Sequence, residues 1–224
     1  MADSKMLIRH ALKIGAIELT PDGRELKSGR ISPYFFNSGL LRTGQDIALY
    51  TEAYIDALRP KLNLVQVLYG VPYKGIPLAT AITVGLWQKM GLDKIAFATS
   101  RKEAKLHGEG GIHIGASLAG KGIAMIDDVV TSGGSGEEAL KYVRTAGGFP
   151  TVFAIAFDRM EVAPNDTLSA VQAFEKTHTI PVVAASSLND LIAVLSEDRE
   201  KIKRGSETLD KILKYRSVYG AKYS

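Results

Sequence analysis

The sequence predicts an α/β fold, in which a mostly parallel open sheet is flanked by helices and a small N-terminal hood covers the ligand edge of the sheet. Short runs rich in β-branched residues alternate with helical patterns, which is typical of βαβ units and of a parallel sheet. The first forty residues stand outside this alternation, and we interpret them, with part of the C-terminal segment, as the hood.

The elements follow in order along the chain. Helical patterns are expected at 5–16, with Met6, Leu7, Leu12 and Ile17 near one face, at 44–59, at 76–90, at 135–147 and in a charged tail from about 198 to 215. Strands are expected at 65–71, 95–99, 122–126, 151–157 and 181–185. The 224 residues contain no Pro/Ser-rich linker and no internal repeat, so we expect a single domain over residues 1–224.

The composition excludes several classes of protein and of site. Cysteine is absent, which excludes disulfides, thiolate nucleophiles and cysteine-ligated zinc or iron–sulfur sites. Hydrophobic residues make up 46% and charged residues 23%, as in soluble globular chains. The sequence shows neither a signal peptide nor an apolar run of about 18 residues. We therefore expect a cytoplasmic protein with no membrane partner.

The charge balance allows two kinds of ligand. A net charge of +4 and a pI near 9.1 fit a nucleic acid or a small phosphorylated substrate. The longest basic cluster, Lys201–Arg204, is short and has no interleaved aromatic residues. We expect no nucleic-acid partner and favour the small substrate.

The most specific local pattern is a strand that runs into two carboxylates and then a small-residue turn. Asp127 and Asp128 stand at the carboxyl end of the strand at 122–126, where ligands bind in open α/β sheets. The turn 131–135 offers glycine backbone and hydroxyl donors to a phosphate at a helix start. Carboxylates accept from vicinal ribose hydroxyls, so the pattern predicts a ribose 5-phosphate pocket. The alternative is a polar strand end with an ordinary helix-capping turn.

A basic segment follows the strand at 95–99. Arg101, Lys102, Lys105 and His107 precede the glycine-rich stretch 108–111. Such a loop suits closure over a dianionic leaving group with exclusion of water. A solvated hairpin with surface lysines is the alternative.

Three further residues are candidates for a pocket that binds a base. Phe35 and Phe36 are adjacent, so in a strand they face opposite sides and only one of them can be simple core. Plain hydrophobic packing of this strand is the alternative interpretation. Arg159 follows the strand at 151–157, and its planar guanidinium can pair bidentately with a carboxylate or an imide edge.

These segments together resemble a known family. The segment 123–135 resembles the signature for 5-phosphoribosyl 1-diphosphate (PRPP) of type I phosphoribosyltransferases. Segments 26–37, 73–77 and 101–111 closely resemble orotate phosphoribosyltransferases, in matching order as far as Arg159. Several family members carry Ala-Gly-Thr where this chain has Ser132-Gly133-Gly134, a change that keeps the backbone cradle and alters only side-chain contacts.

The resemblance implies the type I phosphoribosyltransferase fold and a reaction. The 5-phosphoribosyl group would pass from PRPP to orotate, giving orotidine 5′-monophosphate and pyrophosphate in UMP biosynthesis. The resemblance further implies Mg²⁺ carried mainly by PRPP and water, with no direct protein ligand assigned. It also implies a homodimer that shares loop 101–111 across its interface.

The resemblance also assigns roles to residues. The expected catalytic residues are Lys102, Lys105, His107, Asp127 and Asp128. The expected PRPP-binding residues are Lys27, Tyr73, Lys74, Arg101, Lys102, Lys105, His107, Asp127, Asp128, Val129, Val130, Thr131, Ser132, Gly133, Gly134 and Ser135. The expected orotate-binding residues are Lys27, Phe35, Phe36, Thr131 and Arg159.

Two alternatives stay open. A sibling enzyme that uses a purine base would share the turn, but the segment 27–37 and Arg159 favour orotate. A PRPP-sensing regulator would keep the fold without turnover, which the intact basic loop disfavours.

Overall fold

The computed structural model describes residues 4–26, 28–105, 111–130, 134–163, 166–198 and 200–222, with 102–105 and 111 described by their backbone alone. Within these ranges the centre is a six-stranded sheet of order β5-β4-β3-β6-β7-β8, parallel throughout except for the pair β4 and β5. The strands are β3 (Val67–Gly70), β4 (Ala96–Lys105), β5 (Gly111–Gly115), β6 (Gly122–Asp127), β7 (Phe149–Asp158) and β8 (Val182–Ser187). The predicted fold class is confirmed.

The central strands are apolar on both faces because each face is covered by helices. Ile123 and Met125 of β6 belong to one hydrophobic core, whereas the alternating Ala124 and Ile126 belong to the other. All four side chains are fully buried. This double burial explains why the strands read as continuous apolar runs.

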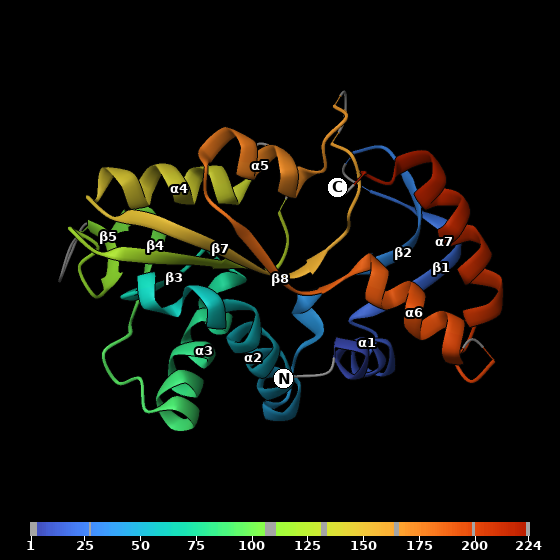
Figure 1. Ribbon diagram of the computed structural model, residues 1–224, viewed down its shortest axis with the longest axis horizontal. Helices are drawn as coiled ribbons and strands as arrows, with labels where there is room; N and C mark the ends of the chain where they lie inside the picture. Colours follow the sequence, from blue (N-terminus) through green and yellow to red (C-terminus); the bar gives the residue numbers. More distant parts are fainter. Residues whose placement is uncertain are drawn as a thin grey trace.

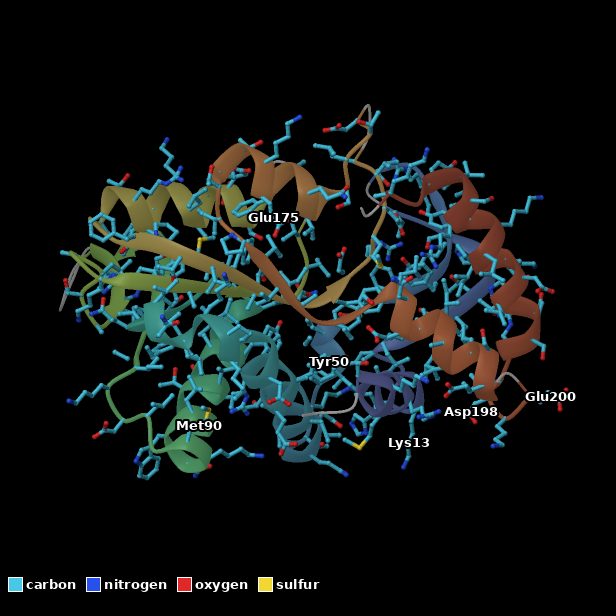
Figure 2. All side chains as sticks on the ribbon, viewed as in Figure 1. Lys13, Tyr50, Met90, Glu175, Asp198 and Glu200 are labelled. Carbon is cyan, nitrogen blue, oxygen red and sulfur yellow. The ribbon has the colours of Figure 1, made fainter. Side chains whose placement is uncertain are left out.

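The helices lie in two layers (Figure 1). Helices α2 (Gly44–Leu58) and α3 (Gly75–Met90) cover one face, and α4 (Ser135–Thr145) and α5 (Ala170–His178) cover the other. Figure 2 shows Tyr50 in the first layer and Glu175 in the second, and a Glu175 carboxylate oxygen accepts from the backbone N–H of Val182 at 2.8 Å. A capping box between Thr43 and Asp46 begins α2.

A second, smaller unit of structure lies beyond β8, at the right of Figure 1. It contains the antiparallel pair β1 (Ile17–Glu25) and β2 (Ile31–Phe36), together with α1 (Ser4–Lys13), α6 (Leu188–Asp198) and α7 (Gly205–Tyr219). Short 3₁₀ helices, η1 (Ser38–Leu40) and η2 (Arg59–Leu64), connect elements. Its buried residues Leu7, Leu191 and Ile212 belong to the same core as the α2 and α3 layer.

Several element predictions need correction. The first helix ends at Lys13 and not at residue 16, because the chain turns at Gly15 with a φ of +77°, and Ile17 opens β1. The charged tail is not one helix over 198–215. Instead α6 ends at Asp198 and α7 begins after Arg204, which has a φ of +65°.

The described part of the chain contains no helix both long and apolar enough to cross a membrane.

Candidate functional site

Two buried acids end the central strand β6. Asp127 and Asp128 are only 4% and 7% exposed. Asp127 accepts from the backbone N–H of Asp128 at 2.9 Å through Oδ1, and from the Ser135 hydroxyl at 2.8 Å through Oδ2. Burial first, and then the charge of Asp128, raise the pKa of Asp127 to about 7. Asp127 therefore exchanges its proton near neutral pH.

Asp128 is held by groups from two other segments. Its Oδ2 accepts from the Lys74 ammonium at 2.9 Å and from the Ser38 hydroxyl at 2.6 Å. Helix α3 begins so close to β6 that a Cβ on Gly75 would lie 2.0 Å from the carbonyl oxygen of Ile126. Only glycine permits this approach, which brings Lys74 beside the acid. The Lys74 side chain is 52% exposed, so it is accessible to a ligand.

One face of β2 is buried against the carboxyl edge of the main sheet. Side chains alternate along a strand, and this face carries Ser32, Tyr34 and Phe36, followed by Ser38 in η1. Phe36 stacks on Phe157 of β7, with ring centroids 5.3 Å apart. Through Ser38 the face ends at the acidic pair.

Arg159 lies at the other end of that face. Its Nη2 donates to the Ser32 hydroxyl oxygen at 3.1 Å and to Oε1 of Glu161 at 2.7 Å. Its guanidinium carbon lies 4.4 Å from the centroid of the Tyr34 ring. The arginine and the acids are thus two halves of one region, joined by β2.

The predicted aromatic pair is divided between the two faces of β2. Phe36 belongs to the hydrophobic core. Phe35 lies on the opposite face, where the Arg24 guanidinium carbon is 3.8 Å from its ring centroid. Phe36 therefore packs beneath the region, and Phe35 is the partly exposed member of the pair.

The remaining predicted site residues differ in how fully the structure describes them. Among the fully described ones, Tyr73 is exposed, Gly134 is the N-cap of α4, and three residues are half-buried: Arg101, Val129 and Val130. Lys102 and Lys105 lie on β4, and the structure describes only their backbone. Lys27, His107, Thr131, Ser132 and Gly133 lie outside the described residues.

The sequence analysis missed residues that act through contacts distant in sequence. Ser38 and Asp128 are 90 positions apart, and Tyr34 and Glu161 are 127 positions apart. The alternation of Ser32, Tyr34 and Phe36 was a usable signal for one shared strand face.

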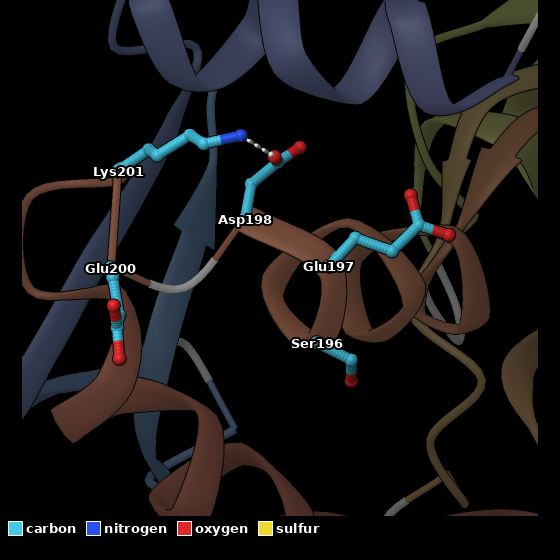
Figure 3. A pocket seen from close by; sticks show the side chains of 5 residues that line it. All are labelled: Ser196, Glu197, Asp198, Glu200 and Lys201. Carbon is cyan, nitrogen blue, oxygen red and sulfur yellow. Dashed lines mark hydrogen bonds and ion pairs between the residues drawn. The ribbon is translucent and has the colours of Figure 1, made fainter.

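A separate hollow of about 200 Å³ lies at the end of α6, away from this region (Figure 3). It is lined by Ser196, Glu197, Asp198, Glu200 and Lys201. Lys201 pairs with Asp198 at 3.2 Å, and Arg9 of α1 pairs with Glu197 and Asp198 at 2.9 and 2.7 Å. These pairs fasten α1 to α6 at the surface, so we assign the hollow no ligand.

Comparison with known proteins identifies the family. No family model matches the chain. The chain is 43% identical over 219 residues to an orotate phosphoribosyltransferase of Bordetella bronchiseptica, covering 95% of each chain. The crystal structure of the orotate phosphoribosyltransferase of Francisella tularensis is 31% identical, with a TM-score of 0.80 over 96% of this chain and 100% of that one. The chain belongs to the orotate phosphoribosyltransferases.

A more distant family member shares the fold alone. The orotate phosphoribosyltransferase of Mycobacterium tuberculosis, solved in complex with PRPP, is 20% identical with a TM-score of 0.61, covering 84% of this chain and 97% of that one. The resemblance stated from the sequence is therefore confirmed. So are its consequences for fold and reaction: orotate phosphoribosyltransferases are pentosyltransferases that move the 5-phosphoribosyl group from PRPP to orotate.

Proposed function

We propose that the region between Asp128 and Arg159 is the active site of this orotate phosphoribosyltransferase, with the sugar bound at the acids and the base at the arginine. The observation that carries the proposal is the buried face of β2, which contacts both ends. The base becomes bonded to the anomeric carbon of the ribose, so the two substrates need adjoining subsites. A single strand face holds two such subsites at a fixed spacing.

On the sugar side, Asp127 and Asp128 accept hydrogen bonds from the ribose hydroxyls. Lys74, Tyr73 and Arg101 face the diphosphate in this proposal, since Lys74 is both exposed and next to Asp128. The turn 131–135, which includes Gly134 and follows Val129 and Val130, holds the 5-phosphate by backbone N–H groups.

On the base side, Arg159 pairs with the carboxylate or imide edge of orotate. Ser32 and Glu161 both bind its Nη2, and in this proposal Nε and Nη1 face the planar ligand. Phe36 and Phe157 form the apolar floor. The family resemblance also assigns Lys27, Thr131 and Phe35 to the pocket, and Phe35 would reach it from the opposite face of β2, where it packs against Arg24.

The donor set of the sugar side fits magnesium. Mg²⁺ prefers oxygen ligands and keeps several waters, and it binds through one or two carboxylates plus substrate phosphates. The described residues include no cluster of three or more His, Asp or Glu side chains for a metal. In our proposal the ion is carried mainly by PRPP and water. When bound, the ion neutralises charge on the diphosphate.

The chemistry needs positioning and charge more than a nucleophile. Cleavage of the anomeric C–O bond develops positive charge on the ribose, which the carboxylates of Asp127 and Asp128 stabilise. Lys102, Lys105 and His107 neutralise or protonate the departing pyrophosphate, and closure of the loop excludes water from the sugar cation.

The decisive experiment is an orotate-depletion assay with PRPP and Mg²⁺, with purine bases as controls. We expect orotate consumption with stoichiometric pyrophosphate release, and no turnover of adenine or guanine. PRPP binding without turnover of any base would instead support the sensing regulator.

We extend the proposal to a single-domain homodimer whose loop 101–111 serves the neighbouring site. Residues 1–40 and part of the C-terminal segment act as a hood over the ligand edge in this proposal. The cytoplasmic location stays a prediction.

Mixing two inactive variants tests the shared loop. A Lys102→Ala subunit and a subunit carrying Asp127→Asn and Asp128→Asn should form heterodimers with one intact site, so activity returns on mixing. Mixing the single variants Asp127→Asn and Asp128→Asn is the control, because both changes lie in the same half of a site. Without recovery after proven subunit exchange, the loop acts in its own subunit.

A further inference from the structure

A nearly buried carboxylate lies two residues beyond Arg159 and has no role in the mechanism above. The side chain of Glu161 is 9% exposed. Its Oε1 accepts from Arg159 at 2.7 Å and from the Tyr34 hydroxyl at 2.8 Å, and its Oε2 accepts from the Tyr215 hydroxyl at 3.0 Å. The three donors come from the segment after β7, from β2 and from α7. Glu161 thus joins three parts of the chain that are distant in sequence.

These contacts restrict the orientation of the Arg159 guanidinium. Both hydrogens of Nη2 are used, one by Glu161 and one by the Ser32 hydroxyl. The Tyr34 ring lies against the guanidinium, and the hydroxyl of that ring bonds the same Glu161 oxygen. Rotation of Arg159 would break several contacts together, which leaves Nε and Nη1 in one fixed direction.

Helix α7 fixes Glu161 in turn. Besides the Tyr215 hydroxyl bond, the backbone N–H of Val162 donates to the carbonyl of Tyr219 at 2.8 Å. The N–H of Ala221 donates to the carbonyl of Met160 at 2.9 Å. The residues on both sides of Glu161 are therefore hydrogen-bonded to the end of the C-terminal helix.

A purely attractive role for Arg159 does not explain this arrangement. Glu161 offsets part of the positive charge that Arg159 and Arg30 would present to an anionic base, since it pairs with both at 2.7 and 3.9 Å. A buried ion pair also adds little stability of its own. Bidentate recognition needs a fixed guanidinium plane. Rotational freedom that Arg159 has already lost in the free protein costs no further free energy when the base binds.

We propose that Glu161 is a positioning residue for orotate, which holds Arg159 in the binding orientation and is itself held by Tyr34 and by Tyr215 of the C-terminal helix. The proposal rests on the proposed function, in which Arg159 binds the base.

The test compares KM values for the two substrates in three variants. Glu161→Gln keeps the size of the side chain and removes its charge, and Tyr215→Phe removes the hydroxyl that donates to Oε2 of Glu161. Tyr219→Phe is the matched control: this tyrosine is on the same helix, its ring centroid is 4.8 Å from that of Tyr215, and its hydroxyl has no hydrogen bond among the described residues.

We expect the orotate KM to rise about tenfold in Glu161→Gln and about threefold in Tyr215→Phe, with kcat and the PRPP KM within about twofold of wild type. Tyr219→Phe should leave all three constants unchanged. Equal rises in both KM values, or the same result for Tyr215→Phe and Tyr219→Phe, would overturn the proposal in favour of a structural role. If Glu161→Gln does not fold, Tyr215→Phe decides the question alone.

Arg159→Ala separates this inference from the proposed function. An unchanged orotate KM in Arg159→Ala overturns the base-binding role and this inference with it. A raised orotate KM in Arg159→Ala with unchanged values in Glu161→Gln and Tyr215→Phe overturns only the role of Glu161. In the double variant with Arg159→Ala, Glu161→Gln should add no further loss, because the side chain that it positions is absent.

Discussion

The acidic half and the arginine half of the proposed site differ in how far neighbouring groups compensate their charges. Asp127 and Asp128 are adjacent and buried, and among the described residues their cationic partner is Lys74, bound to Asp128 alone. Arg159 is instead matched by the carboxylate of Glu161. One half keeps uncompensated negative charge in the free chain, whereas in the other Glu161 lies between two arginines, Arg159 at 2.7 Å and Arg30 at 3.9 Å.

In the proposed site, this difference matches what the sugar and the base each need. A sugar that becomes cationic gains from nearby negative charge, even where that charge destabilises the free protein. A planar base needs donors in a fixed direction, and an arginine held through Nη2 by Ser32 and Glu161 provides them. Substitutions in one half should therefore leave substrate binding at the other half unchanged.

The largest effect is expected at the acids. Asp128→Asn and Asp127→Asn should each lower kcat by on the order of 100-fold, because the developing ribose cation loses a negative partner. Steady-state kinetics with both substrates measure this. Asp22→Asn, at a carboxylate that is 81% exposed and paired with Arg204, is the control. Wild-type kcat/KM in both variants would remove the acids from the mechanism.

The next effect concerns the base alone. Arg159→Ala should weaken the binding of orotate by about 1–3 kcal/mol and leave the PRPP KM unchanged, since the polar edge of the base loses its partner. Arg204→Ala, at a surface ion pair, serves as the control. Similar losses for both substrates would show that the two halves are not separate.

A third prediction concerns stability and pH. The pKa of Asp127 is about 7 in the folded chain against an ordinary 3.8, so the folded state binds the proton more tightly than the unfolded state. As the pH rises from 3.8 to about 7, the free energy of unfolding therefore falls because of Asp127. The slope is at most about 1.4 kcal/mol per pH unit.

Urea unfolding without substrates checks the sign. Asp127→Asn should gain stability relative to wild type between pH 5 and pH 8, and lose that gain as the pH falls. A wild-type advantage that grows with pH would contradict the raised pKa and the contrast between the two halves.

The smallest effect is expected where β2 meets the acids. Ser38→Ala removes one hydrogen bond to Asp128 and should raise the PRPP KM about fivefold, with the orotate KM unchanged. Ser196→Ala, whose hydroxyl bonds only its own helix at Ile192, is the control. A rise confined to orotate would place Ser38 on the base side.

The sequence predicts those features that local patterns determine. The acids follow a buried β-branched strand and precede a small-residue turn, so their place at the sheet edge was predictable from residues 123–135 alone. Arg159 is equally local, directly after the end of β7.

Other features depend on contacts that no local pattern contains. Ser38 and Glu161 look like ordinary loop residues, although Ser38 contacts Asp128 90 positions away and Glu161 contacts Tyr34 127 positions away. Helix α5 was missed although Ser169 and Gln172 form a capping box that the sequence displays. There the signal was present, and the shortness of the helix hid its period.

The alternation along β2 also limits which changes in length evolution can accept. A single-residue insertion or deletion between Ser32 and Ser38 would exchange the two faces of the strand, and would move Tyr34 and Phe36 outward together. Relatives of this chain should therefore keep the spacing from Ser32 to Ser38 unchanged.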